Sequence, residues 1–210
     1  MIILFDLDGT LIDSTEAILE GFHHSYDSLE HSHAKDEDIK ALIGYPLDVM
    51  YRELGVQESL ISNFIQTYKK HYREIFTQKT NFLDGSKEAI VLASQFASLG
   101  IVTTKTGKFS QELMEYFEIM NYFKILIGRE QVEYPKPHPE PILKALQSFQ
   151  TKGEEIWMIG DTKLDLISAK DAGVNSIGVL SGYDNRETLA KFTDILFDDV
   201  LEAVRYLKSK

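Results

Sequence analysis

Two aspartates stand two residues apart near the start of the chain, directly after an apolar run. The run Ile2–Phe5 is followed by Asp6, Asp8 and Gly9. Two nearby carboxylates repel each other, so either one pKa rises or a cation neutralises the pair. Gly9 allows a sharp turn and a close approach of the backbone to a ligand. Because Asp-Gly is also a common turn sequence, these residues taken alone fit a plain turn equally well.

Two further segments offer groups that bind an anion. In the segment 102–105, VTTK, Thr103 leaves an apolar run, and its hydroxyl can bond an anionic oxygen. In the segment 136–141, KPHPEP, three prolines in six residues stiffen the loop and start a helix. Such a loop can hold Lys136 as a fixed positive charge. Taken alone, a strand threonine and an exposed lysine are the simpler interpretations.

A fourth segment, 159–165 with the sequence IGDTKLD, carries two more acids. Gly160 permits a close turn before Asp161, and Asp165 lies four residues later, one helical turn on if a helix begins there. A helix N-cap explains Asp161 equally well when the segment is considered by itself. The meaning of the segment therefore depends on its place in the fold.

Short apolar runs come before the four segments and alternate with amphipathic stretches. We predict buried strands at Ile2–Phe5, Ile101–Thr103, Ile125–Ile127, Ile156–Ile159 and Ser176–Leu180, with a short edge strand at Ile195–Phe197. Helical spacing of apolar residues predicts helices within Lys87–Leu99, Leu113–Met120, Pro141–Phe149, Leu164–Ala172 and Asp199–Leu207. Continuous apolar strands joined by crossover helices predict an α/β fold whose parallel sheet is covered on both faces.

All four polar segments fall at or just after predicted strand ends. In a parallel sheet the carboxyl ends of the strands share one edge, and ligands bind there. Acids from the first and fourth segments, a hydroxyl from the second and a lysine from the third should therefore meet. Carboxylates bind a hard divalent cation, for which Mg²⁺ is the natural candidate. The lysine, the hydroxyl and turn amides would hold a phosphate, so the sequence predicts one site for both.

The interval from about residue 14 to 80 breaks the alternation. It contains no strand-like run, but Ile18, Phe22, Tyr26 and Leu29 fall on one helical face. Residues 60–75 repeat this pattern over a longer segment. We therefore predict a core of residues 1–13 and 81–210 and a helical insert of residues 14–80.

The composition excludes several classes of function. The chain carries 22 Lys+Arg and 33 Asp+Glu, which gives a net charge of −11 and argues against a nucleic-acid binder with a broad basic face. It has no cysteine, which rules out disulfides, thiolate nucleophiles and Cys-ligated zinc. No apolar run approaches the roughly 18 residues of a membrane span, and no signal peptide is expected. We expect a cytoplasmic protein without membrane contact.

The four segments also resemble a known family. DLDGT, VTTK, KPHPEP and GDTKLD resemble the four ordered motifs of the haloacid dehalogenase-like hydrolases, and the match covers nearly the whole chain. The helical interval falls where the phosphoglycolate-phosphatase-like branch inserts a cap. The resemblance implies a Rossmann-like parallel sheet core with an inserted helical cap domain. It also implies Mg²⁺-dependent phosphoryl transfer through an aspartyl-phosphate.

The resemblance assigns catalytic roles to the acids of the first motif. It makes Asp6 the nucleophile that attacks phosphorus in line. Asp8 would be the general acid toward the leaving oxygen and then the base for the hydrolytic water. Thr103, the backbone amide of Thr104 and Lys136 would bond the transferring phosphoryl oxygens, and Lys136 would also offset the charge of Asp6.

The resemblance likewise implies a metal site. Mg²⁺ would be bound by Asp6, by Asp161 and by the backbone carbonyl of Asp8. Asp165 would orient the metal's water or Lys136. Thr10 would hold the metal ligands in place without binding the metal itself.

Substrate choice is expected to lie in the cap. IGYPLD, residues 43–48, resembles the substrate-facing loop of that domain. The candidate residues for specificity are Ser14, Thr15, Gly44, Tyr45 and Arg52, and for each of them ordinary packing or a surface position is the alternative.

The expected function is a phosphatase for a small phosphate monoester, such as a phosphoglycolate-like metabolite. Thr104 departs from the TNK of many phosphoglycolate phosphatases, and VTTK resembles family members described as pyrophosphatases, so an inorganic pyrophosphatase stays an alternative. A phosphomutase like the β-phosphoglucomutase relatives is another, although those often resemble DLDGV and Thr10 stands here. The presence of Asp8 argues against a dehalogenase.

An alternative of a different class is a catalytically silent binding module that kept the fold. Intact Asp6 and Asp8 argue against it. The partner is expected to be a small phosphorylated metabolite, with neither nucleic acid nor membrane, and the chain is expected to act as a monomer or homodimer.

Overall fold

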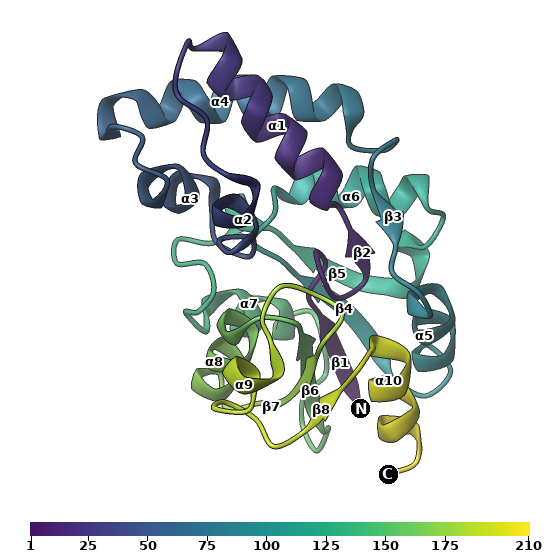
Figure 1. Ribbon diagram of the computed structural model, residues 1–210. Helices are drawn as coiled ribbons and strands as arrows, with labels where there is room; N and C mark the ends of the chain where they lie inside the picture. Colours follow the sequence, from purple (N-terminus) through teal and green to yellow (C-terminus); the bar gives the residue numbers. More distant parts are fainter. The chain divides into compact units, whose positions relative to one another are not determined.

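The computed structural model describes residues 1–210 and divides into two compact units. One unit comprises Met1–Asp13 and Phe82–Lys210, and the other comprises Ser14–Asn81. Figure 1 follows the chain through both of them. None of the helices combines the length and the apolar character that crossing a membrane requires.

A six-stranded sheet forms the centre of the first unit, with the strand order β5-β4-β1-β6-β7-β8. Its strands are β1 (Ile2–Phe5), β4 (Ser98–Val102), β5 (Phe123–Ile127), β6 (Ile156–Gly160), β7 (Asn175–Val179) and β8 (Leu196–Phe197). All five pairings are parallel. Every residue of β1 is buried, as the central strand of a sheet covered on both faces requires. The predicted α/β fold with a parallel sheet is confirmed.

Helices cover the sheet on two sides. They are α5 (Ser86–Ala93), α6 (Gly107–Tyr116), α7 (Glu140–Leu146), α8 (Lys163–Asp171), α9 (Arg186–Leu189) and α10 (Val200–Lys208). In Figure 1, α5 and α10 lie together on one side of the sheet and α7 and α8 on the other. Ile142 of α7 and Ala169 of α8 pack with Leu4, Val102 and Met158 of the strands. Burying each large aliphatic side chain contributes about 1.5–3 kcal/mol, so this packing stabilises the sheet.

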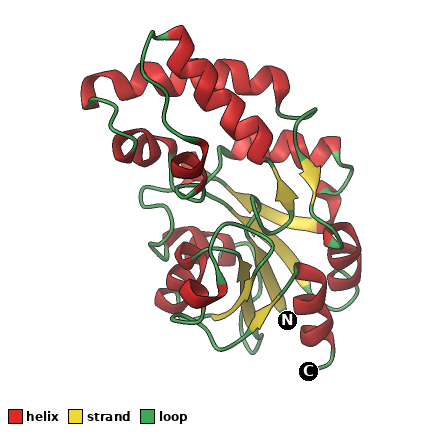
Figure 2. Cartoon of the chain, viewed as in Figure 1, coloured by secondary structure: helices red, strands yellow, loops and turns green.

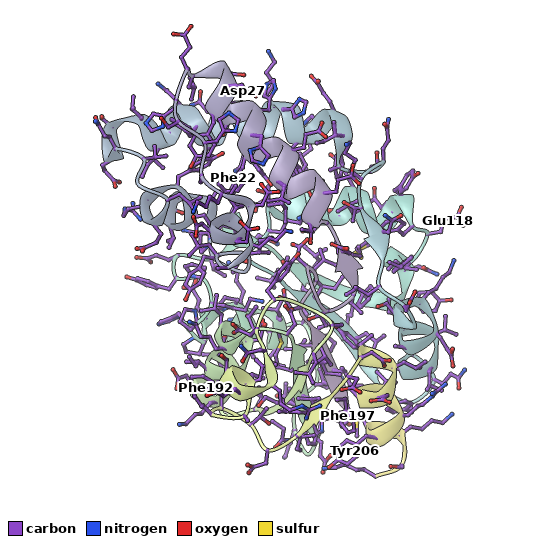
Figure 3. The ribbon with its side chains drawn as sticks, viewed as in Figure 1. Phe22, Asp27, Glu118, Phe192, Phe197 and Tyr206 are labelled. Atoms are coloured by element: carbon purple, nitrogen blue, oxygen red, sulfur yellow. The ribbon has the colours of Figure 1, made fainter.

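Helices α5, α6 and α7 end earlier than their apolar spacing suggested, and α7 stops at Leu146 instead of Phe149. Helix α5 stops at Ala93 instead of reaching Leu99, because Ser98 and Leu99 pair with β1 as the first residues of β4. Helix α6 stops at Tyr116, because Glu118, labelled in Figure 3, has a φ of 60°. That left-handed conformation ends a helix, and Met120 falls in a separate short 3₁₀ turn, Met120–Tyr122.

The second unit is helical, as Figure 2 shows. Its helices are α1 (Thr15–Ser28), α2 (Asp36–Lys40), α3 (Leu47–Glu53) and α4 (Glu58–Ile75). Helix α1 packs along α4 through aromatic side chains. The Phe22 ring, labelled in Figure 3, lies 4.5 Å from the Tyr51 ring and 5.3 Å from the Tyr68 ring, centroid to centroid. Such pairs add about 0.5–1.5 kcal/mol each beyond their buried area.

Two very short strands stand where the chain leaves and rejoins the first unit. They are β2 (Ile12–Asp13) and β3 (Asn81–Phe82), and they form a separate two-stranded sheet. Next to them the Leu83 amide donates to the Leu11 carbonyl at 3.1 Å. The pairing of β2 with β3 and this hydrogen bond bring together the segment that leads into the insert and the segment that leads out of it.

Candidate active site

The carboxyl ends of the three central strands lie level with one another. Phe5, the last residue of β1, is paired with Ile101 of β4 and with Ile159 of β6. Asp6 therefore leaves β1 beside the ends of both neighbouring strands, and its amide donates to the Ile159 carbonyl at 2.9 Å. Thr103 follows β4 directly. This register brings the first, second and fourth polar segments to one edge of the sheet.

Lys136, from the loop before α7, lies buried among the acids. Its Nζ stands 2.8 Å from Asp6 Oδ1 and 2.5 Å from Asp165 Oδ1, and it also donates to the Val102 carbonyl at 3.1 Å. Its side chain is only 2% exposed. Because a buried ammonium needs such partners, Lys136 is fixed between the two carboxylates.

Asp165 is held by the start of its own helix. Its Oδ2 accepts from the Thr162 amide at 3.0 Å and from the Thr162 hydroxyl at 2.7 Å. Asp165 and Thr162 thus form a capping box at the N-terminus of α8. Since one oxygen binds Thr162 and the other binds Lys136, both are engaged, and Asp165 positions Lys136.

Asp161, directly after β6, is fully buried and held from two other segments. The Thr10 hydroxyl donates to its Oδ1 at 2.8 Å, and the Tyr183 amide donates to its Oδ2 at 3.0 Å. Thr10 is thus in contact with Asp161, where sequence analysis placed a supporting residue. The Tyr183 amide was not predicted, because a backbone donor leaves no mark in the residue type.

Glycines let the backbone close on the Asp161 carboxylate. A Cβ on Gly9, whose φ is +83°, would stand 2.3 Å from Asp161 Oδ2. A Cβ on Gly182 would stand 2.0 Å from the same atom. Any side chain at either position would collide with the carboxylate, so the first motif and the loop after β7 both need glycine here.

Three buried carboxylates share this edge of the sheet. Oxygen atoms of Asp6, Asp161 and Asp165 all lie within 4.8 Å of one another. Burial, and then repulsion by Asp165, raises the pKa of Asp6 to about 7 against the attraction of Lys136. The pKa of Asp161 is likewise raised well above its usual range, first by burial and then by the charges of Asp6 and Asp165.

Lys136 alone does not balance this charge. Burial by itself would lower the pKa of Lys136, but the charges of Asp165 and Asp6 outweigh it and raise that pKa. One ammonium therefore faces three carboxylates, which leaves two negative charges when all three are ionised. A hard divalent cation fits both this excess and the set of oxygen donors.

A second lysine, Lys105, binds Asp8. Its Nζ lies 2.9 Å from Asp8 Oδ1 and 3.1 Å from Asp8 Oδ2. The Lys105 amide donates to Thr103 Oγ1 at 3.2 Å, and the threonine hydroxyl can still donate its own hydrogen. No role was predicted for Lys105, although it belongs to the segment VTTK. The available signal was that Lys105 stands two residues after Thr103, on the same strand-end turn.

The remaining predicted residues belong to the unit Ser14–Asn81. Ser14 and Thr15 stand at the start of α1, and Gly44 and Tyr45 lie between α2 and α3. Arg52, in α3, donates to Glu58 at 2.8 and 2.9 Å, so its guanidinium is bound within the insert. Their part in substrate choice stays a prediction.

Comparison with known proteins gives consistent matches over most of the chain. A family model described as haloacid dehalogenase-like hydrolase matches residues 3–179. A pyrophosphatase PpaX of Anoxybacillus flavithermus is 34% identical over 194 residues, covering 90% of this chain and 88% of that protein. A pyrophosphatase PpaX of Bacillus cereus is 31% identical over 205 residues, covering 92% and 94%.

A solved structure shows the same fold. It is a hydrolase of the haloacid dehalogenase-like family from Streptococcus pneumoniae, with a TM-score of 0.88 and 27% identity, covering 98% of this chain and 97% of that one. The resemblance carried by the four motifs is thereby confirmed at the level of family and fold. The chain belongs to the haloacid dehalogenase-like hydrolases.

Proposed function

We propose that this enzyme is a Mg²⁺-dependent phosphatase that forms a phosphoryl-enzyme on Asp6. The observation that carries the proposal is the contact between Asp6 Oδ1 and Lys136 Nζ at 2.8 Å, at the end of the central strand. A carboxylate held beside a fixed ammonium can approach the phosphorus of an anionic substrate, because the ammonium offsets the repulsion between the two anions.

In the first step a carboxylate oxygen of Asp6 attacks phosphorus, and the bond from phosphorus to the leaving oxygen breaks. Asp8 gives its proton to that oxygen. In the second step Asp8 takes a proton from water, the water oxygen attacks phosphorus, and the bond to Asp6 breaks, which releases inorganic phosphate. Lys136, the Thr103 hydroxyl and the Thr104 amide would bind the phosphoryl oxygens through both steps.

The acidic cluster supports a place for Mg²⁺. Asp6, Asp161 and the backbone carbonyl of Asp8 would hold the ion. The donors to Asp161 are neutral, so its charge stays available to a cation, whereas Asp165 has the Lys136 ammonium on one oxygen and Thr162 on the other. When bound, Mg²⁺ would balance the two excess negative charges of the cluster and polarise a phosphoryl oxygen as a Lewis acid. The hydrogen bonds from Thr10 and the Tyr183 amide fix the orientation of the Asp161 carboxylate.

Two classes of substrate fit this proposal. The relatives named pyrophosphatase PpaX, which span most of this chain, and the VTTK segment favour inorganic pyrophosphate. A phosphoglycolate-like monoester uses the same machinery. We further propose that the insert contributes to the choice through Ser14, Thr15, Gly44, Tyr45 or Arg52, and that the enzyme works in the cytoplasm on a small phosphorylated metabolite.

Phosphate release from three compounds tests the proposal. Purified enzyme with Mg²⁺ is assayed with inorganic pyrophosphate, phosphoglycolate and para-nitrophenyl phosphate. We expect turnover of the aryl ester and a higher kcat/KM for one of the two natural compounds. No phosphate release from any of the three would contradict the assignment as a phosphatase.

Removal of divalent cations with EDTA is expected to abolish turnover, and Mg²⁺ is expected to restore it. Ca²⁺ should restore less than about a tenth of the rate, because it takes more ligands at longer distances than Mg²⁺. Mg²⁺ should also raise the Tm, since it relieves repulsion among buried carboxylates. In Asp161→Asn this rise in Tm should shrink or vanish. An EDTA-treated enzyme of unchanged rate would refute the metal requirement.

A further inference from the structure

Lys105 is a second cation of the site, and the two steps proposed above give it no role of its own. Lys136 contacts Asp6 and Asp165, whereas Lys105 contacts both oxygens of Asp8. The two lysines therefore serve different sides of the reaction, one beside the nucleophile and one beside the acid. The Lys105 side chain is 8% exposed, so its charge is largely shielded from solvent.

The backbone of Lys105 is fixed on both sides. Its amide donates to Thr103 Oγ1 at 3.2 Å, and its carbonyl accepts from the Arg129 amide at 3.0 Å. A Cβ on Gly128 would stand 3.0 Å from that carbonyl oxygen and still closer to Gly107, so the turn packs tightly on the loop after β5. The ammonium group thus extends from a rigid base.

The position of Asp8 determines which part of the substrate the Lys105 ammonium can contact. A general acid must lie within hydrogen-bond reach of the oxygen that it protonates, so the leaving group must stand against Asp8. The Lys105 ammonium, about 3 Å from both oxygens of Asp8, is then next to the part of the leaving group beyond the protonated oxygen. If that part carries a negative charge, Lys105 can bind it. A neutral phenol or alcohol offers no such charge.

Resting on the proposed function, we propose that Lys105 determines the substrate class of this site. It selects phosphate esters and anhydrides whose leaving group carries a negative charge in addition to the one that develops on the departing oxygen. Inorganic phosphate leaving from pyrophosphate and glycolate leaving from phosphoglycolate both meet this condition, whereas para-nitrophenol carries no second charged group. Lys105 thereby acts as a binding residue for the leaving group in addition to its contact with Asp8.

The test compares Lys105→Met and Lys105→Arg with Lys108→Met, a control on the next turn whose side chain is 65% exposed. The measured quantity is kcat/KM for pyrophosphate, phosphoglycolate and ethyl phosphate. Ethyl phosphate releases an uncharged alcohol that needs a proton from Asp8, as the glycolate leaving group does, so loss of the contact to Asp8 should lower kcat/KM for these two esters by a common factor. Beyond that factor, Lys105→Met should lower kcat/KM for the charged substrate that wild type prefers by about 10- to 200-fold relative to ethyl phosphate. Lys105→Arg should recover part of this preference.

Equal losses for all three compounds in Lys105→Met would overturn the proposal and leave Lys105 as a positioning residue for Asp8. Turnover of ethyl phosphate alone by wild type would overturn it as well. Wild type inactive on every compound would instead sink the proposed function. For that case, and for a methionine variant that does not fold, the affinity of Asp6→Asn for pyrophosphate is measured by isothermal titration calorimetry, with and without the second substitution Lys105→Gln. Affinity that falls about tenfold or more when Lys105→Gln is added supports a leaving-group site, and unchanged affinity overturns it.

Discussion

Asp6→Asn is expected to remove nearly all phosphatase turnover while the fold stays intact. Asp6 is 4% exposed and stands at the end of the central strand, and the amide of asparagine cannot attack phosphorus. We expect the rate to fall by at least about 10³-fold, since covalent catalysis supplies far more than the 1.4 kcal/mol of a tenfold change. Lys136 keeps its contact with Asp165 in this variant, so the buried ammonium still has a carboxylate partner.

The measurement is the steady-state rate with para-nitrophenyl phosphate, with circular dichroism to check the fold. Asp171→Asn, an exposed position at the end of α8, makes the same chemical change away from the site and should keep the wild-type rate. A folded Asp6→Asn enzyme that retains more than about a tenth of the rate would sink the assignment of the nucleophile.

Lys136→Met is expected to lower both activity and stability. The substitution leaves Asp6 and Asp165 buried without their shared ammonium, and stranding a buried charge in this way costs about 3–5 kcal/mol. Turnover should fall by roughly 10²–10³-fold, because a preorganised charge on the phosphoryl oxygens is lost.

Urea unfolding in the presence of EDTA measures the stability change, since bound Mg²⁺ would partly replace the missing charge. Lys170→Met, at an exposed position of α8, is the matched control and should change the free energy of unfolding little. A Lys136→Met protein as stable as wild type under these conditions would show that Lys136 does not compensate the buried acids.

The convergence of the four polar segments was predictable, because its cause is a rule of topology. Each segment follows a short apolar run, and parallel strands bring their carboxyl ends to one edge. Asp6 and Thr103 are brought together in this way although they lie far apart along the chain. Lys136 joins them from a loop after β5, between Asp6 and Asp165.

Two of the contacts that orient these side chains could not be predicted. Lys105 reaches Asp8 across a sequence separation of 97 residues, and nothing in its residue type distinguishes it from an exposed lysine. The Tyr183 amide holds Asp161 through a backbone atom, which any residue would supply.

Element boundaries failed where pairing competed with helical spacing. Leu99 continues an apolar helical pattern, but its pairing with Ile3 in the sheet places it in β4. The two-residue strands β2 and β3 were not predicted, because so short a segment shows no periodicity.

Trapping of a phosphoryl group on Asp6 tests the central claim most directly. Asp8→Asn is mixed with Mg²⁺ and para-nitrophenyl phosphate, quenched in acid, and its peptides are analysed by mass spectrometry. Para-nitrophenolate leaves without help from an acid, so the first step should proceed while hydrolysis, which needs Asp8 as base, slows. We predict a phosphoryl group on Asp6 that accumulates in Asp8→Asn and is absent from Asp6→Asn. A phosphoryl group on another residue, such as Asp161, or none at all while wild type turns over, would contradict the account.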